Sequence, residues 1–299
     1  MASDPLSEVI PGPKVVAVIV AYHPDLPLLD RVIESTAAMV SGIVVINNDR
    51  GDWPAGLQRP VFVHTPAGNI GLAAAYNVGA SFAQREGATH LLLLDQDSVP
   101  SAGMVTRLLE PYSGKAPIGA VGPLWKDPRT GESAGFAVRF GEKKIPKSDE
   151  VVKVEFLISS GSLIALAALS EIGPFDDQLF IEHVDTDWSL RASAKGFGLY
   201  GVASAVLEHT IGDAILEVPG TGRRAFMYPS ERTYYLVRNS IRLWLRPYAT
   251  WRWRAFDAWR LCRLIPLYLV FAPDRGGRFK AILQGVRDAF RPDIAERPR

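Results

Sequence analysis

Short apolar runs that alternate with helix-like segments constrain the fold more than any other feature of the chain. The runs KVVAVIVA (14–21), IVVI (43–46) and LLLL (91–94) show no polar alternation, which is typical of strands buried on both faces. Segments 28–39 and 72–86 have the composition of helices, and the second is rich in alanine. This alternation predicts an α/β fold, with a mostly parallel central sheet flanked by helices.

Polar clusters follow three of the predicted strands directly. These clusters lie at 22–25, 47–49 and 95–97. Ligands of such sheets bind beyond the carboxyl ends of the strands. We therefore expect the three clusters to share one rim of the sheet and to form a binding site there.

Asp95-Gln96-Asp97 is the strongest local signal for chemistry. Two carboxylates one residue apart, directly after an apolar strand, repel each other unless a cation lies between them. Mg²⁺ or Mn²⁺ fits this role, because such ions take one or two carboxylates and complete their shell with water and phosphate oxygens. The alternative is a solvated turn whose acids cap the next helix.

A third acidic segment follows in the second half of the chain, where short strands are punctuated by glycine and proline. Segment 180–195 reads as a loop that runs into a helix. On this helix Asp187 and Arg191 are four residues apart and able to pair, which leaves Asp185 to face a cleft as a general base. Glu182 is a competing candidate for the base, and a helix-capping role for Asp185 is the alternative.

Two further segments carry weaker signals. In segment 69–79, Gly71 permits a tight entry into a helix whose N-terminus favours anions, although close packing of this helix on the sheet explains the small residues equally well. His209 follows the apolar run 201–207. A histidine at a strand end either completes a metal site or is structural.

The composition limits the compartment and the class of protein. Cys262 is the only cysteine, so no disulfide forms within the chain, as expected for a reducing compartment. The first fourteen residues contain acids and prolines and no apolar segment, and no run approaches the ~20 apolar residues of a membrane span. We expect a cytoplasmic protein, soluble or peripheral at the inner face of the membrane.

The C-terminal part differs in charge from the rest. From Arg238 onward there are fourteen basic and five acidic residues, a net charge of +9, whereas the preceding part has nineteen and twenty-seven, a net charge of −8. Four of the seven tryptophans lie in the same part, at 244, 251, 253 and 259. Arginine and tryptophan on a helix suit an anionic membrane surface. The alternative is a helical pair packed on the preceding part of the chain. No nucleic-acid-binding module is present.

Taken together, the segments resemble family 2 glycosyltransferases of the GT-A fold, and within them the bacterial rhamnosyltransferases. The resemblance is ordered along residues 14–243 and is carried by AYHPD (21–25), VINND (45–49), NIGLAAAYNVG (69–79), LLLLDQD (91–97), GSLIA (161–165), IGPFDDQLFIEHVDTDWSLRA (172–192), LEHTIGD (207–213) and YYLVRNSIRL (234–243). It implies a catalytic domain at 14–239, with a nucleotide-sugar-binding half at 14–115 and an acceptor-binding half at 116–239. The change of composition past Asn239 marks a basic helical extension at 240–299.

The resemblance also implies roles for individual residues. Asp185 matches the catalytic base, and Asp97, His209 and Asp95 match the metal site. The residues that match the donor site are Ala21, Tyr22, Asn47, Gly71, Asn77, Asp95 and Gln96. The acceptor side would include Gly161, Glu182, Trp188, Arg191 and Arg238. Many relatives have aspartate where this chain has Asn47, whereas Val184 before the base matches the rhamnosyltransferase pattern.

The function that the resemblance implies is inverting transfer of one sugar. The donor would be dTDP-L-rhamnose, and the acceptor a glycan or lipid-linked glycan of a surface polysaccharide such as O-antigen. Two alternatives stay open. The first is a UDP-hexose-dependent transferase of the same fold, and the second is a non-catalytic module that binds sugar nucleotides or glycans.

Overall fold

A central sheet of nine strands organises the chain. A computed structural model describes residues 12–49, 61–129, 131–133, 135–209, 214–218 and 223–291. The strands of the main sheet path are, in spatial order, β3 (Phe62–His64), β2 (Gly42–Asn47), β1 (Val15–Ala21), β4 (His90–Asp95), β10 (Leu163–Ala165), β6 (Ile118–Lys126), β11 (Gly198–Glu208) and β5 (Val99–Pro100), and β9 (Val151–Val154) also pairs with β11. Residues 210–213 and 292–299 of the predicted segments lie outside the described residues.

The sheet is mostly parallel, as the strand–helix alternation predicts. β3, β2, β1 and β4 are parallel neighbours, and so are β6 and β11, while β10 runs antiparallel between β4 and β6. The run Leu91–Leu94 in β4 is fully buried, and each such side chain contributes roughly 1.5–3 kcal/mol. The apolar runs thus form the centre of the sheet.

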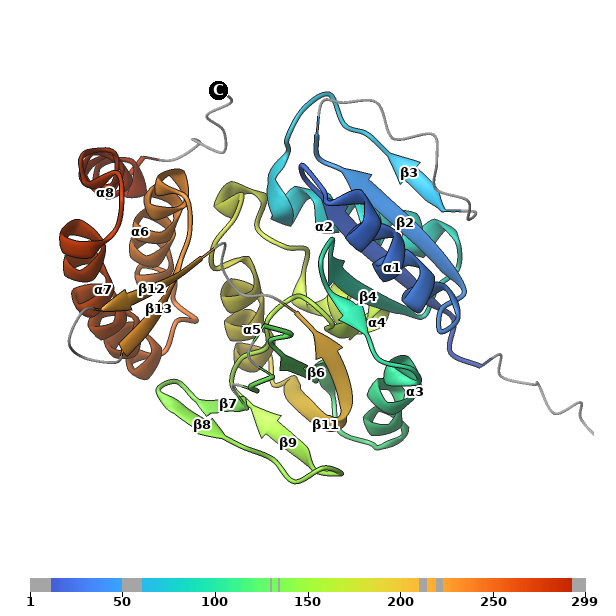
Figure 1. The fold of residues 1–299 in the computed structure, drawn as a ribbon. Helices are drawn as coiled ribbons and strands as arrows, with labels where there is room; N and C mark the ends of the chain where they lie inside the picture. Colours follow the sequence, from blue (N-terminus) through green and yellow to red (C-terminus); the bar gives the residue numbers. More distant parts are fainter. Residues whose placement is uncertain are drawn as a thin grey trace, which may run out of the picture.

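Helices cover both faces of the sheet (Figure 1). The helices of this domain are α1 (Leu26–Ala37), α2 (Gly71–Arg85), α3 (Met104–Leu109), α4 (Leu166–Ile172) and α5 (Val184–Ala194). α1 and α3 pack on one face of the sheet, and α2, α4 and α5 on the other. The first helix starts earlier than predicted because Asp25 caps it by accepting from the Leu28 amide at 3.1 Å.

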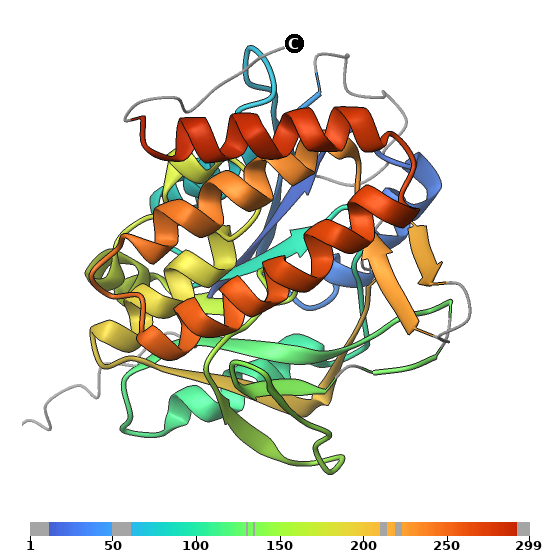
Figure 2. The ribbon, with the colours of Figure 1, turned by 90° about the vertical axis from the view of Figure 1, so that its left-hand side faces the viewer.

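Two hairpins and three further helices complete the described chain. The hairpins are β7–β8 (Phe136–Arg139 and Glu142–Lys144) and β12–β13 (Ala214–Val218 and Arg223–Met227), and the helices are α6 (Ser230–Trp244), α7 (Trp251–Phe271) and α8 (Arg275–Ala289). Figure 2 shows the three helices side by side across one side of the molecule. Leu243 and Trp253 join them to the core of the sheet face that carries α2.

The helical extension is attached closely, through small residues and buried charges. A Cβ on Gly285 of α8 would lie 2.8 Å from the Tyr234 carbonyl oxygen of α6, so glycine permits the close contact. The Arg278 guanidinium is buried and donates to the Thr233 hydroxyl at 3.0 Å and the Tyr228 carbonyl at 2.7 Å. Among the described residues, none of the helices combines the length and apolar character that crossing a membrane requires.

Candidate active site

The ends of the parallel strands meet at one rim, as predicted from the polar clusters. Ala21 is in register with Asn47 on β2, and Val20 with Asp95 on β4. A cleft of about 1330 Å³ opens at this rim. It is lined by the strand ends of the N-terminal half, by the start of α5, by the β7–β8 hairpin and by α6 and α7, so segments far apart in sequence share it.

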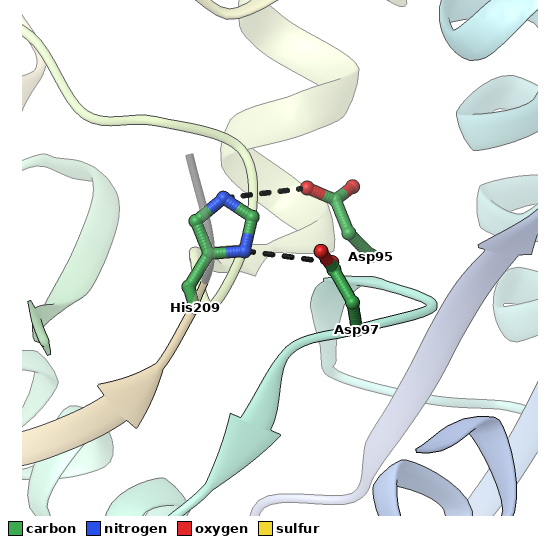
Figure 3. A group of neighbouring side chains, drawn as sticks. All are labelled: Asp95, Asp97 and His209. Carbon is green, nitrogen blue, oxygen red and sulfur yellow. Dashed lines mark ion pairs between the residues drawn. The ribbon is translucent and has the colours of Figure 1, made fainter. Parts of the chain in front are cut away.

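Asp95, Asp97 and His209 come together in this cleft (Figure 3). The His209 Nε2 atom lies 4.0 Å from Asp95 Oδ2, and its Nδ1 atom lies 3.6 Å from Asp97 Oδ1. One ligand atom from each residue lies within 4.8 Å of the others. Asp95 ends β4, Asp97 lies two residues further on, and His209 follows β11, so two strand ends more than a hundred residues apart supply the group.

Neighbouring hydroxyls orient two of the three side chains, those of His209 and Asp95. Ser98 Oγ lies 2.8 Å from His209 Nδ1 and 2.6 Å from Ser160 Oγ. The Tyr76 hydroxyl, on α2, donates to Asp95 Oδ1 at 3.3 Å. Contacts of this kind fix the orientation of metal-binding side chains and are part of a working site.

The charges of Asp95, Asp97 and His209 shift the pKa values within this group. Burial raises the pKa of Asp95, partly offset by His209. Burial alone would lower the pKa of His209, but Asp97 and Asp95 outweigh burial and the net shift is upward. Two carboxylates and an imidazole that share a partly buried site form a donor set suited to Mg²⁺ or Mn²⁺. Because Ser98 occupies Nδ1, Nε2 is the nitrogen left to bind an ion.

Asp185 lies in the first turn of α5 and faces the same cleft. Its carboxylate accepts from the Thr186 amide at 2.7 Å. Burial raises its pKa to about 6, and the negative charges of Glu182 and Asp95 add to this effect, while hydrogen bonds from the Thr186 and Ser159 amides oppose it. A carboxylate with a pKa near neutrality is suited to accept a proton from a substrate hydroxyl.

Glu182, the competing candidate, has a different environment. Arg232 on α6 donates from Nε at 2.8 Å and lies 2.6 Å away through Nη2. Both contacts are to Glu182 Oε1, so this carboxylate is held in an ion pair and is less available to a substrate hydroxyl. The geometry therefore favours Asp185 over Glu182 as the proton acceptor.

The loop before Asp185 has an unusual backbone. Phe180, Glu182 and His183 all have positive φ angles, of 63°, 62° and 63°, and each such residue costs about 1–3 kcal/mol. Asn239 on α6 holds this loop, because its Nδ2 donates to the carbonyls of Leu179, Ile181 and Glu182 at 2.7–2.9 Å. The loop is thus held from outside by α6.

Some predicted donor-side residues do line the cleft. Gln96 bonds to both backbone groups of Tyr22, accepting from its amide at 2.6 Å and donating to its carbonyl at 3.1 Å, which ties the end of β1 to the acidic loop. Gly71 also lines the cleft, with φ at 82°, and a Cβ there would lie 2.5 Å from the Phe180 ring. The first amides of α2, those of Leu72 and Ala73, donate to the Phe180 carbonyl, so they are not available to an anion.

Other predicted donor-side residues lie behind the cleft wall. Ala21 and Asn47 are buried at the strand ends, and neither lines the cleft. Asn77 points away from it and bonds to the Phe175 carbonyl at 2.9 Å, joining α2 to the loop before α5. Asn48, one residue past Asn47, lines the cleft instead.

The structure also places most of the predicted acceptor residues away from the cleft. Trp188 is 3% exposed in the core, and its indole donates to the Gly173 carbonyl. Arg191 pairs with Asp187 at 2.8 Å and donates to the Pro174 carbonyl. These three residues of α5 lie on its buried side, because the helix turns them away from Asp185.

Gly161 and Arg238 have structural positions as well. Gly161 has a φ of 83°, and a Cβ there would lie 2.5 Å from Pro123, so it is required for a tight turn beside Ser160. Arg238 is 1% exposed and donates to the Gln178 and Leu179 carbonyls. It supports the loop before Asp185 and does not reach the cleft.

One wall of the cleft is formed by residues that the sequence patterns do not predict. Its residues come from the β7–β8 hairpin and from α6 and α7: Arg139, Phe140, Lys143, Tyr228, Arg232, Tyr235, Trp253, Phe256, Trp259 and Arg260. The cluster of tryptophan and arginine in the extension was the available signal. By its composition alone this cluster predicts membrane contact or packing on the rest of the chain, and not a contribution to the cleft.

Sequence comparisons point to sugar transfer. No protein-family model matches the chain. A dTDP-rhamnosyl transferase, RfbF of Shigella flexneri, is 26% identical over 238 residues, which cover 76% of this chain and 78% of that protein. An uncharacterised protein of Mycobacterium tuberculosis strain H37Rv, Rv1525, is 29% identical over 175 residues, which cover 55% of this chain and 62% of that protein.

Structural comparisons show the fold. The GalNAc-T7 structure with UDP, GalNAc and Mn²⁺ superposes with a TM-score of 0.55 at 16% identity, over 87% of this chain and 58% of that one. The structure of residues 1–349 of Staphylococcus aureus TarS gives 0.53 at 11% identity, over 92% and 80%. The mannosyltransferase PcManGT of Pyrobaculum calidifontis, with GDP-Man and Mn²⁺, gives 0.52 at 12% identity, over 93% and 87%.

Proposed function

We propose that this chain, which has the GT-A fold of these transferases, is an inverting glycosyltransferase that moves L-rhamnose from dTDP-L-rhamnose to a glycan acceptor. One observation carries the proposal: the group of Asp95, Asp97 and His209 lines the same cleft as Asp185, a carboxylate suited to be a base. The likeness to the Shigella flexneri dTDP-rhamnosyl transferase supports the choice of donor.

Asp185 is the proton acceptor in the proposed reaction. It takes the proton of the acceptor hydroxyl while that oxygen forms a bond to the anomeric carbon of the donor sugar. The bond from the anomeric carbon to the diphosphate oxygen breaks, and the nucleoside diphosphate leaves with both electrons. Because this is a single displacement, the configuration at the anomeric carbon inverts.

The acidic group holds the other end of the donor. Asp95, Asp97 and His209 would bind Mg²⁺ or Mn²⁺, which neutralises the charge that develops on the leaving diphosphate. Gln96 and Tyr22 then form the adjacent wall, on the donor side of the cleft. No carboxylic acid is needed to protonate the leaving group, so one base is sufficient.

Calorimetric titration of the purified chain with dTDP and UDP, each with and without Mn²⁺, tests the proposal. We expect Mn²⁺-dependent binding of dTDP that exceeds the binding of UDP, and its loss in Asp97→Ala. Tighter binding of UDP would replace the rhamnose donor by a UDP-hexose. If the folded chain bound neither nucleotide, the catalytic reading would be contradicted and a non-catalytic glycan-binding module would replace it.

The acceptor is proposed to be a lipid-linked glycan, with the chain at the inner face of the cytoplasmic membrane. Support comes from an exposed apolar stripe along α8 and its C-cap residue, formed by Phe279, Leu283, Val286 and Phe290 at 42–66% exposure. Their spacing places them on one helical face. Exposed Arg275, Lys280 and Arg287 lie on the same helix. A basic helix with an apolar face suits the surface of an anionic membrane.

Co-sedimentation with phosphatidylglycerol vesicles tests the membrane contact. The wild type should sediment with these vesicles and less with phosphatidylcholine alone, and Leu283→Ser should reduce binding by about tenfold because apolar contact is lost. Leu245→Ser, at a residue 66% exposed outside α8, is the matched control and should bind like the wild type. Equal loss in both variants would contradict a role for the α8 stripe.

A further inference from the structure

Helix α7 and the β7–β8 hairpin line the cleft with aromatic rings that the proposed chemistry does not use. Phe140 of the hairpin and Phe256 and Trp259 of α7 all line it. The ring centroids of Phe140 and Phe256 are 6.0 Å apart, and those of Phe256 and Trp259 are 6.4 Å apart. Together they form a continuous row, which we call the aromatic shelf.

The shelf is held rigidly by both elements. Glu155 accepts from the Phe140 amide at 2.8 Å, and a Cβ on Gly141 would lie 3.4 Å from the Phe256 ring, so the hairpin turn rests directly on α7. The Arg263 guanidinium lies 4.4 Å from the centre of the Trp259 ring. This cation supports one face of the indole.

The shelf adjoins the loop that carries the proposed base. Trp253 is buried behind the shelf, with its ring 6.4 Å from Phe140 and 5.8 Å from His183. His183 lies two residues before Asp185. Trp253 and His183 thus connect the shelf to the loop that carries Asp185, whereas Gln96 and Tyr22 lie at the end of β1 beside the acidic group.

The chemistry of the shelf identifies the class of ligand. Trp259 remains 54% exposed at the cleft, although an aromatic ring gains most when it is covered. Sugar rings have one face made of C–H groups, and such a face stacks on an aromatic ring, while hydroxyls at the ring edge are hydrogen-bonded by polar groups. Arg139 and Lys143 of the hairpin supply such donors at the edge of the same wall.

We propose that the aromatic shelf of Phe140, Phe256 and Trp259 is the acceptor subsite, where a sugar ring of the acceptor glycan stacks with its hydroxyl directed to Asp185. This assignment rests on the proposed function, since it names the site of the second substrate. It also gives the helical extension a direct part in binding. Of the acceptor residues expected from the sequence, Glu182 lines the cleft, whereas Gly161, Trp188, Arg191 and Arg238 do not.

Saturation-transfer NMR tests the shelf, with methyl glycosides of glucose, galactose, mannose, N-acetylglucosamine and rhamnose as probes. The wild type, with dTDP and Mn²⁺, should transfer saturation to at least one glycoside, and Trp259→Ala should weaken its binding by about tenfold because the stacking partner is removed. Trp259→Phe should restore most of the binding. Trp251→Ala is the matched control, because Trp251 lies on the same helix, is 77% exposed and does not line the cleft.

The outcomes separate the shelf from the proposed function. The titration of Trp259→Ala with dTDP and Mn²⁺ should equal that of the wild type, which shows that the variant is folded and binds the nucleotide. Equal glycoside binding by the Trp259 and Trp251 variants, or no binding of any glycoside by the wild type, would overturn the shelf alone. Loss of nucleotide binding from the wild type would overturn the proposed function instead.

Discussion

At the scale of single residues, the environment of Asp185 links catalysis to stability. Its carboxyl is partly buried near two other acids, and these surroundings raise its pKa to about 6. The unfolded chain has no such surroundings, so its aspartate ionises at the ordinary value of 3.8. The folded state therefore holds a proton that the unfolded state releases, and stability falls as the pH rises from about 4 through 6.

The prediction concerns Asp185→Asn, which removes both the base and the charge. We expect sugar transfer to fall by about 10²–10⁴-fold, while the metal-free variant gains about 1–2 kcal/mol of unfolding free energy at pH 7.5 because a desolvated charge is gone. The gain should vanish near pH 4. Urea unfolding at the two pH values and an assay of transfer check these points.

Glu182→Gln is the matched comparison. It also removes a negative charge near Asp185, but it breaks the ion pair with Arg232, so it should lower the unfolding free energy. Transfer that survives in Asp185→Asn and fails in Glu182→Gln would show that the base is assigned to the wrong residue.

At the scale of elements, the close packing of α2 on the sheet depends on Gly79. A Cβ on Gly79 would lie 2.4 Å from Val18 Cγ1 of β1, too close for either side chain to remain in place. Gly79→Ala should lower the unfolding free energy by about 1–3 kcal/mol through overpacking, even though alanine is the better helix former. Denaturant unfolding measures the change.

Gly276 of α8 provides the control, because no atom lies within 4 Å of a Cβ placed there. Gly276→Ala should be neutral or slightly stabilising, by up to about 1 kcal/mol. A Gly79 variant as stable as the Gly276 variant would show that helix α2 moves away from the sheet without cost.

The support of the loop before Asp185 gives another prediction. Asn239→Ala removes three hydrogen bonds to the carbonyls of Leu179, Ile181 and Glu182 and should cost about 2–4 kcal/mol. Asn239→Asp keeps the shape and loses the donors, so it should cost a similar amount. Both should lower transfer more than metal-dependent nucleotide binding, since the loop positions the base; an equal loss of both would point to general unfolding.

The buried strands, and the rim of the sheet at which they end, were predictable from the sequence for a physical reason. Buried parallel strands such as 91–94 must be apolar on both faces, and Asp95 and Asp97 mark the point where the strand reaches solvent. These are local patterns, so they are readable without coordinates. The fold and the shared rim followed from them.

Contacts between distant segments were not predictable in this way. Trp188 and Arg238 have the composition of binding residues, yet both are buried and bonded to backbone carbonyls of the loop before α5. Phe256 and Trp259 look like residues of a surface helix, yet α7 crosses the cleft beside the hairpin. Whether such a side chain is buried in the core or lines the cleft depends on how distant helices and strands pack together. No local sequence pattern predicts that packing.

At the scale of the whole molecule, His183 joins the catalytic domain to the extension. Its Nε2 atom lies 2.9 Å from the Ser240 hydroxyl of α6 and accepts from the Arg260 guanidinium of α7 at 3.0 Å. Asp257 lies 3.8 Å away, and Arg260 holds that carboxylate. Since Nε2 accepts a hydrogen bond from a permanent cation, this nitrogen carries no proton in the folded state.

Low pH should therefore weaken the contacts of His183 with α6 and α7. Burial lowers the pKa of His183 from 6.5 to about 4; Arg260 also lowers it, while Asp257 and Glu182 oppose the shift. Between pH 4 and pH 6.5 the unfolded chain binds a proton at this histidine and the folded chain does not. The contribution of neutral His183 to the unfolding free energy is therefore fully present above pH 6.5 and is lost as the pH falls. At pH 5 the loss from this residue amounts to about 2 kcal/mol.

The test is a comparison of the wild type with His183→Asn, which tolerates the positive φ and does not titrate. Between pH 7.5 and pH 5 the wild type should lose about 2 kcal/mol more unfolding free energy than the variant. Contributions of titrating groups that do not interact with His183 are common to both proteins and cancel in the difference. Equal losses would mean that water reaches His183 in the folded state, and that the extension does not depend on a neutral imidazole to hold the base loop.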